Sequence, residues 1–279
     1  MKIKQNIERN TLNKIVKFLI LFLFTVPTAY CSNEAFVIKE LNLELVKCPA
    51  GSFMMGSPEE EHSTIKKEMD SFHKDTYGFE YSEGLHSVNI NKAFYIGKYE
   101  VTQSQYIAIM GNNPSKFKGD NNPVESIDWV KAKLFCAKLN CLYKKYLPKG
   151  YKFDLPTEEQ WEYACRADIS TAFNNGNNNL DNIDEVAWYS ENASYTTHII
   201  GQKTPNAWGI YDMHGNVWEW CKDEYKDYSE KNIRDCDRVV RGGSFYDTAI
   251  FCRSANRFNN NISCCAFCLG FRVALIPIQ

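Results

Sequence analysis

Hydrophobic positions recur with helical spacing in three segments of the chain. The strongest is 123–146, in which two heptad-spaced rows of apolar residues share one side: Trp129, Cys136 and Tyr143, and Ala132, Leu139 and Tyr146. Thr102 and Thr157 each stand three residues before a glutamine, which is the spacing of a capping box, so a helix is expected to begin after each. The pattern therefore predicts one long and two shorter helices.

Apolar positions outside these helices come in short stretches bounded by glycine. Gly51–Gly56 and Ala93–Val101 have the length and composition of strands. The asparagine- and glycine-rich sequence from Asp168 to Asn182 predicts a loop. The remainder has Gly-Asn, Gly-Gly and Leu-Gly turns, which favour short strands joined by long loops. Few helices, short strands and much irregular chain indicate an α+β fold.

The C-terminal segment from Arg241 to Ala274 differs from the rest of the chain. A frame of glycine- and arginine-containing blocks surrounds two runs of mixed residues that show neither helical nor strand periodicity. We call these the first run, Tyr246–Phe251, and the second run, Phe258–Cys268; the frame consists of Arg241–Phe245, Cys252–Arg257 and Leu269–Arg272. A regular frame around irregular runs indicates a scaffold that presents a changeable surface.

The N-terminus has the pattern of a secretory signal. Basic residues precede an apolar stretch, Phe18–Phe24, and small residues follow it. The stretch is shorter than the roughly 20 residues of a membrane-spanning helix, although a short uncleaved anchor remains an alternative. Cys31 stands where a bacterial lipoprotein carries its acylated cysteine, with Tyr30 before it as a poor fit. We expect an exported protein of the bacterial envelope or surface, with Cys31 as a lipid-anchor site.

Composition narrows the domain organisation and the classes of partner. A chain of 279 residues with 44% hydrophobic residues can form one large core. The expected organisation is a leader at 1–31, a linker with a first strand at 32–47, and one domain at 48–279. A formal net charge of −2 gives no electrostatic basis for binding nucleic acid, so no such partner is expected. The 11 cysteines include no pair of CxxC motifs with the spacing of a zinc finger.

Several blocks, read in order, resemble the formylglycine-generating enzyme (sulfatase-modifying factor) family. The resemblance covers Cys48 to Ala274 and implies an α+β fold with a C-type-lectin-like core. Its blocks are Gly51–Gly56, Tyr99–Thr102, Asn122–Glu125 with Trp129, Leu155–Ala164, Asn206–Cys221, Arg241–Ser244 and Gly270–Arg272.

The catalytic chemistry of that family transfers poorly. In the oxidases, two cysteines five residues apart shortly after the Gly-Gly-Ser block hold copper. Here Phe245–Cys252 contains one cysteine, and none lies five residues from Cys252, so no copper is expected. The five histidines are scattered without the spacing of an iron site. A formylglycine-generating oxidase, a related nonheme-iron enzyme and a non-catalytic structural relative remain the alternative functions.

A calcium loop is implied by the same resemblance. In the family, one Asn or Asp side chain, two backbone carbonyls and a glutamate surround the ion. The matching residues here are Asp212, Gly215, Val217 and Glu219, which supply the hard oxygen ligands that calcium prefers. A structural calcium ion is therefore expected. The alternative is that Asp212 and Glu219 only cap turns.

The frame and its runs further resemble the variable proteins of diversity-generating retroelements. In those proteins, mutation at adenines of AAC codons rewrites the C-terminal segment. Such changes yield Asn, Ser, Thr, Ile, Tyr, Phe, Cys, Asp, Ala and Leu, but not Lys, Glu, Gln, Met or Trp. Every residue of both runs belongs to the permitted set. The resemblance implies a hypervariable binding face for an unknown protein or surface ligand.

The expected binding face contains twelve residues of the variable segment 246–268, with Asp247 at its centre. An ordinary polar loop is one alternative, but the many apolar residues argue against it. Buried core of a cysteine-rich terminal subdomain is the other alternative. The expected binding residues are Tyr246, Asp247, Thr248, Ile250, Phe251, Phe258, Asn260, Ser263, Cys264, Ala266, Phe267 and Cys268.

Overall fold

The computed structural model describes residues 29–31, 35–59, 61, 65, 83–181, 183–226 and 236–278. The predicted leader up to residue 28 lies outside these ranges. At 29–31 only the backbone is described, so the side chain of Cys31 also lies outside them. Within the described ranges, no helix combines the length and the apolar character that crossing a bilayer requires.

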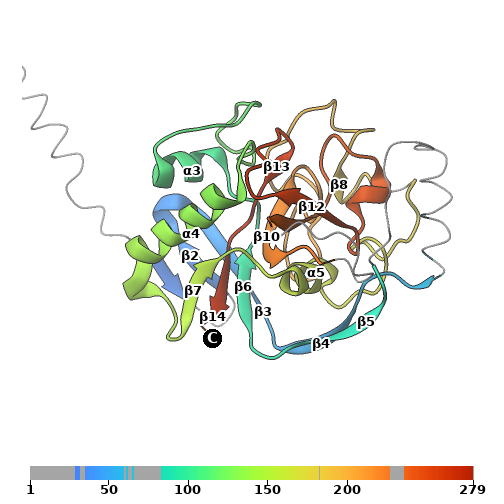
Figure 1. Cartoon of the computed structure of the whole chain (residues 1–279), viewed down its shortest axis with the longest axis horizontal. Helices are drawn as coiled ribbons and strands as arrows, with labels where there is room; N and C mark the ends of the chain where they lie inside the picture. The colour runs from blue at the N-terminus through green and yellow to red at the C-terminus, as the bar shows by residue number, and fades with distance from the viewer. Residues whose placement is uncertain are drawn as a thin grey trace, which may run out of the picture.

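The largest sheet is antiparallel and carries the main core. Its strand order is β1 (Ala29–Cys31), β2 (Ala35–Ile38), β3 (Leu43–Cys48), β6 (Phe94–Gly97), β14 (Ala274–Pro277) and β7 (Tyr151–Asp154). Figure 1 shows α3 (Gln103–Met110) and α4 (Trp129–Tyr143) beside β2, β7 and β14. Apolar residues of the sheet and of α4, including Phe153 and Phe135, form one buried cluster.

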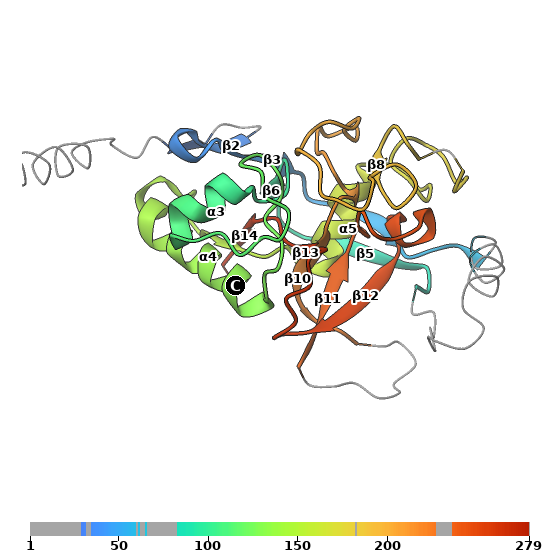
Figure 2. The same cartoon turned by 90° about the horizontal axis from the view of Figure 1, so that it is seen from above.

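A second sheet presents the C-terminal segment. Its order is β12 (Arg257–Asn261), β11 (Asp237–Arg241), β10 (Trp218–Glu224) and β13 (Leu269–Gly270), and only the β10–β13 pair is parallel within it. In Figures 1 and 2 this sheet and α5 (Glu158–Arg166) lie beside the half that contains α3 and α4. The second run therefore begins on the edge strand β12, whereas the frame includes the end of β11 and the strand β13.

Four short strands and three 3-10 turns complete the described fold. The strands β4 (Gly51–Met55) and β5 (His86–Ile90) pair antiparallel, and β8 (Ala187–Trp188) and β9 (His214–Gly215) pair parallel. The 3-10 turns are η1 (Lys39–Leu41), η2 (Lys144–Tyr146) and η3 (Ala249–Cys252). The predicted α+β fold with few helices and much irregular chain is confirmed.

The two predicted capping boxes are present. The Thr102 hydroxyl accepts a hydrogen bond from the Gln105 backbone N–H, and the Gln105 side chain accepts one from the Thr102 N–H in return. Thr157 and Gln160 make the same reciprocal pair at α5. Both helices therefore begin where the local sequence satisfies the free backbone N–H groups.

The long helix begins later than its hydrophobic pattern predicts. Ser126 has a φ of 61°, in the left-handed region, which cannot continue a right-handed helix. Asp128 then caps α4, because its carboxylate accepts from the Lys131 N–H at 2.7 Å. The predicted strand Ala93–Val101 is similarly shortened, to β6.

The segment 32–47, predicted as a linker with a first strand, contains β2 and most of β3. Strands β2 and β3 pair with each other, and β3 pairs with β6 inside the main sheet. Phe36 and Leu45 are fully buried in the main core. Residues 35–47 therefore pack with the predicted domain from residue 48, because the main core includes their apolar side chains.

Candidate binding face

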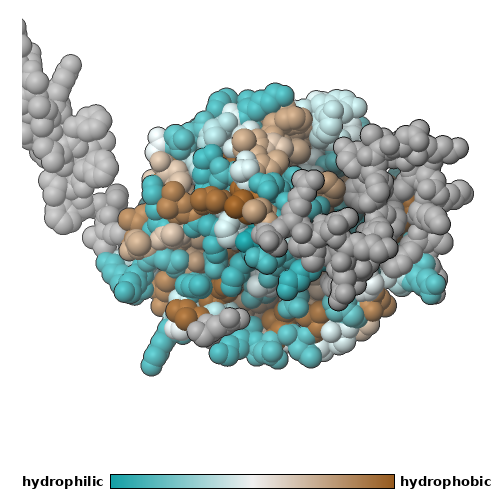
Figure 3. Space-filling view, viewed as in Figure 1, coloured by the Kyte–Doolittle hydropathy of each residue, from teal (hydrophilic) through white to brown (hydrophobic). Residues whose placement is uncertain are grey.

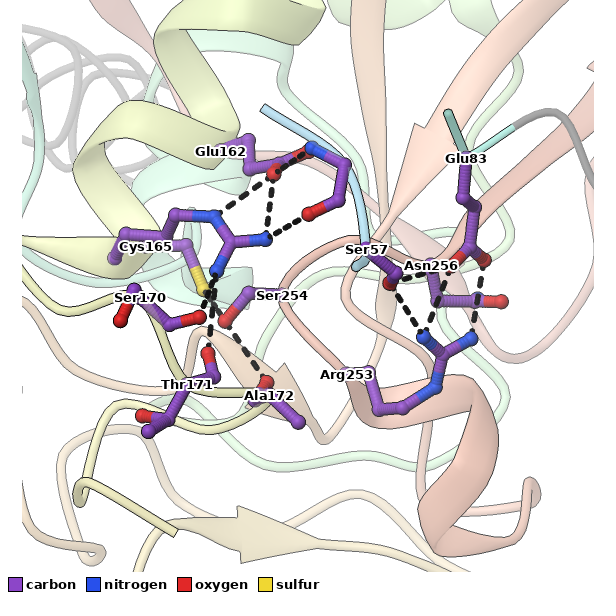
Figure 4. Close-up of polar contacts among 12 residues, drawn as sticks. Ser57, Glu83, Glu162, Cys165, Ser170, Thr171, Ala172, Arg253, Ser254 and Asn256 are labelled. Carbon is purple, nitrogen blue, oxygen red and sulfur yellow. Dashed lines mark hydrogen bonds and ion pairs between the residues drawn. The ribbon is translucent and has the colours of Figure 1, made fainter. Parts of the chain in front are cut away.

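Buried ion pairs hold the frame in place. Four arginines of the frame are buried: Arg241, Arg253, Arg257 and Arg272. Arg253 donates to both oxygens of Glu83, at 2.9 and 3.0 Å, and to the Ser57 hydroxyl (Figure 4). Burial alone would favour a neutral Glu83, but the Arg253 guanidinium outweighs it and lowers the pKa of Glu83. The frame is thus tied to the N-terminal half of the domain.

Buried polar side chains also pair with one another around α5. Glu162 binds both Arg241 and Arg166 and also accepts from the Gly56 N–H at 2.8 Å. Beside it, the Ser254 hydroxyl donates to the carbonyl of Ala172 and lies 3.4 Å from the Cys165 thiol (Figure 4). These side chains satisfy one another inside the protein, so they serve the scaffold and leave the surface to the runs.

Gly243 allows the turn that leads into the first run. Its φ is 72°, and a Cβ there would lie 2.7 Å from the Cys252 sulfur and 2.9 Å from the Phe251 carbonyl. Only glycine fits both the left-handed backbone and this close approach. The turn places Tyr246, which is 55% exposed, at the surface.

Asp247 is held by the frame and is not a free surface carboxylate. Its Oδ2 accepts from the Trp218 indole N–H at 2.8 Å and from the Ser244 hydroxyl. Burial raises the pKa of Asp247, although those two hydrogen bonds favour the ionised form. Asp247 therefore fixes the start of the first run, while its predicted place at the centre of the face remains a prediction.

The end of the first run turns inward. Residues Ala249–Cys252 form η3, which places Ile250 at 6% exposure. Phe251 is partly buried against the main core, and Thr248 is half-buried. The inclusion of Ile250 in a surface binding face is therefore wrong, because the 3-10 turn directs its side chain into the protein. At this position the buried-core alternative describes the run better.

The second run begins as an edge strand and is not irregular there. In β12, Phe258 pairs with Val240 and Asn260 pairs with Arg238. Since alternate residues of a strand share a face, Phe258 and Asn260 lie on the same side, and the Phe258 ring lies 5.7 Å from that of Trp218. The short apolar pattern did not predict this strand, because its pairing partner β11 is distant in sequence.

The rest of the second run packs against the main core. Ser263 is exposed in a turn in which the Asn261 side chain accepts from both its N–H and its hydroxyl. The carbonyl of Ala266 accepts from the Ser126 N–H at 3.2 Å. The predicted binding residues Cys264, Ala266 and Cys268 are half-buried against the main core. Figure 3 shows hydrophobic side chains gathered over α4, and a second, paler group near β13.

The two runs meet through aromatic side chains. The Tyr246 and Phe267 ring centroids lie 5.7 Å apart in an edge-to-face arrangement. Three residues outside the runs join them, and sequence analysis missed all three: Lys116, Phe117 and Tyr195. No motif or periodicity marks these positions, because long-range contacts alone bring them to the runs.

The predicted calcium ligands lie close to a buried arginine. Both oxygens of Glu219 accept from Arg272, each at 2.6 Å, and one also accepts from the Trp161 indole N–H. One oxygen of Asp212 accepts from the Gly201 N–H, and the other has no hydrogen-bond partner among the described residues. Burial raises the pKa of Asp212 to about 6.

The predicted calcium set fits this arrangement only in part. The unpartnered Asp212 oxygen suits a cation, but the Glu219 oxygens already bind Arg272. The tight turn at Gly215 also brings the chain against the Trp188 carbonyl, where a Cβ would lie 2.0 Å away. No group of three or more His, Cys, Asp or Glu in the described parts of the chain is arranged to hold a metal. Calcium, with Val217 as a further ligand, remains a prediction that the pairing of Glu219 with Arg272 opposes.

The cysteine nearest to the family's copper position is deeply buried. Cys252 has no exposed surface, and its thiol donates to the carbonyl of Thr248 at 3.8 Å. Burial raises the pKa of this thiol well above its usual value. Both its burial and its raised pKa disfavour a reactive thiolate at Cys252 in the metal-free protein.

Comparison with known protein families is decisive for the fold. Residues 37–276 match the model of the sulfatase-modifying factor enzyme 1-like domain. The chain belongs to this family. The match begins inside β2, which agrees with the packing of residues 35–47 in the main core.

Individual relatives include both a chaperone and an enzyme. The chain is 36% identical to the chaperone protein LppX of Paenibacillus barcinonensis, and the match covers 54% of this chain and 69% of that protein. It is 29% identical to the mouse formylglycine-generating enzyme, and the match covers 59% of this chain and 47% of the enzyme. The chain thus spans about half the length of that enzyme.

Among solved structures, Treponema denticola variable protein 1 is similar along nearly the whole chain. The TM-score is 0.70 with 26% identity, and the match covers 91% of this chain and 100% of that one. The described fold is therefore shared by a variable protein and by enzymes of the family.

Proposed function

We propose that this protein is an exported binding protein whose two runs form a hypervariable face on a scaffold like that of formylglycine-generating enzymes. The observation that carries the proposal is the division of the C-terminal segment. The frame arginines are buried in ion pairs, whereas Tyr246 and Ser263 in the runs are exposed. The exposed residues of the runs can thus change while the ion pairs remain.

The chemistry of the runs supports binding. Tyr246, Phe258 and Phe267 supply rigid apolar contact area, and Asn260 and Ser263 supply adaptable hydrogen bonds. The likeness to Treponema denticola variable protein 1 and the restriction of both runs to residues reachable from AAC codons favour the same function.

The DNA beside the gene tests this proposal most directly. We expect a near-copy of the 3′ coding end that differs from it mainly at adenines, next to a reverse transcriptase gene. The differences should fall in the codons of 246–268 and spare those of the frame arginines. If the near-copy and the reverse transcriptase gene are both missing, the proposal fails and a non-catalytic relative of the enzymes becomes the better description. Turnover of a sulfatase-type cysteine peptide by the copper-loaded protein would also overturn it.

Export and lipid anchoring form a separate part of the proposal. The basic and apolar leader with Cys31 supports them. When cells that express the protein are grown with a labelled fatty-acid precursor, the wild-type protein should carry the label. The Cys31→Ser variant should not. Unlabelled wild-type protein would overturn the lipid anchor.

A further inference from the structure

We propose that Lys116, Phe117 and Tyr195, which lie outside the runs, complete the binding face. The partner they fit is a protein that presents a carboxylate beside an aromatic or aliphatic side chain. This inference rests on the proposed binding function and adds a constant part to the hypervariable face.

Tyr195 is an exposed aromatic residue on a strained turn. It is 61% exposed, and its ring centroid lies 5.7 Å from that of Tyr246 in the first run. Ser194 and Tyr195 have φ values of 51° and 57°, so two consecutive non-glycine residues adopt the left-handed conformation. A strained turn that holds an exposed ring against the run points to a role in binding.

Lys116 places a cation over the aromatic residues. Its Nζ lies 4.3 Å from the Phe267 ring centroid and 5.1 Å from that of Phe117. Within the described part of the chain, Lys116 forms no ion pair with a carboxylate. Its three N–H donors therefore remain available to a carboxylate of a partner.

The loop that carries Lys116 and Phe117 is fixed by buried polar residues. The Phe117 N–H donates to Glu125 at 2.8 Å, and the Phe117 carbonyl accepts from the Gln103 side chain at 2.7 Å. The Gly119 N–H donates to the same glutamine at 3.1 Å. Glu125 and Gln103 are fully buried, so this part of the face is ordered before a partner binds.

Together these residues give the face a defined chemistry. The rings of Phe117 and Phe267 lie beside the Lys116 ammonium group, and ring contacts extend this cluster through Tyr246 to Tyr195. Contacts from several separated segments form an extended surface, and clustered aromatic residues are typical of protein interfaces. Charge complementarity then selects an acidic group next to an apolar one, whichever residues occupy the runs.

A peptide library displayed on phage, panned against the whole protein, tests this inference. Enriched peptides should carry Asp or Glu next to an aromatic or aliphatic residue. Lys116→Glu should weaken their binding at least about tenfold, and Tyr195→Ala by a similar factor, with the melting temperature unchanged because both side chains are exposed. The exposed Lys149, near the start of β7, provides the charge-matched control Lys149→Glu, which should bind normally. Panning against Lys116→Glu should instead enrich Lys- or Arg-containing peptides.

The outcomes separate this inference from the proposed function. A variant with Tyr246, Ser263 and Phe267 changed to asparagine should lose the selected peptides if the runs bind them. If that variant loses binding while Lys116→Glu and Tyr195→Ala keep it, the constant part is refuted and the proposed function stands. If the run variant binds the selected peptides with wild-type affinity, the runs do not bind them and the proposed function fails. Enriched peptides without carboxylates would overturn the acidic partner.

Discussion

The frame and the runs occupy one continuous segment but depend on different interactions. Frame arginines bind carboxylates far away in sequence, as Arg253 binds Glu83 across a separation of 170 residues. The exposed residues of the runs contact one another and a few neighbours, as Tyr246 contacts Phe267 and Tyr195. The difference teaches that a scaffold can be independent of its surface when its own polar groups are paired internally.

The comparison has one internal exception. Ile250 belongs to the first run by sequence, but its side chain is as buried as the core residues. The runs are therefore not uniformly free to vary. Substitutions can locate the boundary between scaffold and surface more finely than the sequence blocks do.

The largest expected effect is in the frame. Arg272→Ala removes the guanidinium that binds both oxygens of Glu219 and the carbonyls of Gly97, Tyr211 and Asp212. A buried carboxylate without its partner should lower the free energy of unfolding by about 3–5 kcal/mol, measured by urea denaturation. Lys131→Ala, which breaks the exposed pair with Asp128, should cost less than about 1 kcal/mol. Equal costs would remove the distinction between frame and surface.

A smaller effect should separate two positions of the first run. Ile250→Asn buries an amide without a partner and should cost about 3 kcal/mol of unfolding free energy, whereas Tyr246→Asn should change it by no more than about 0.5 kcal/mol. Thermal and urea denaturation of both variants measure this contrast. Tolerance of Ile250→Asn would show that the whole run is free to vary.

Asp247 in the first run and Glu83, which binds the frame, should change the stability of the protein with pH in opposite directions. The raised pKa of Asp247 means that the folded protein holds this proton more tightly than the unfolded chain, so its stabilising contribution exists in acid and is lost as pH rises. Asp247→Asn should therefore be slightly more stable than wild type at pH 7, by less than about 1 kcal/mol, and lose that advantage below about pH 4. Glu83, with a lowered pKa, contributes stability above its unfolded pKa and loses it in acid. A less stable Asp247→Asn at pH 7 would mean that the hydrogen bonds from Trp218 and Ser244 outweigh burial.

The smallest expected effect concerns calcium. Because Glu219 binds Arg272, removal of calcium with EDTA should shift the melting temperature by less than about 1 °C. A drop of several degrees that added calcium reverses would show that Glu219 leaves Arg272 to bind the ion.

Local signals in the sequence predicted local structure well. The capping boxes at Thr102 and Thr157 were predictable because both partners lie within one helical turn. The start of α4 was missed because the left-handed Ser126 interrupts an apolar pattern that continues through it. The strand β12 was missed because it depends on its pairing with β11, which no short window of sequence contains.

The candidate site was predicted only in part for the same reason. Residue types in the runs indicated a binding face, but Lys116 and Tyr195 reach it through the tertiary fold alone. Likewise, the repeated arginines of the frame were visible in the sequence, whereas their carboxylate partners were not. Pairing between distant residues is decided by packing and not by spacing.

The position of β14 has a consequence for how such a gene can change. This last strand lies between β6 and β7 inside the main sheet, and it follows both runs in the chain. A rewritten copy that shifts the reading frame or stops early within 246–268 would lack a central strand and could not complete the sheet. Only variants that retain an intact β14 would then fold, so folding itself would remove truncated or frame-shifted variants before they could bind a ligand.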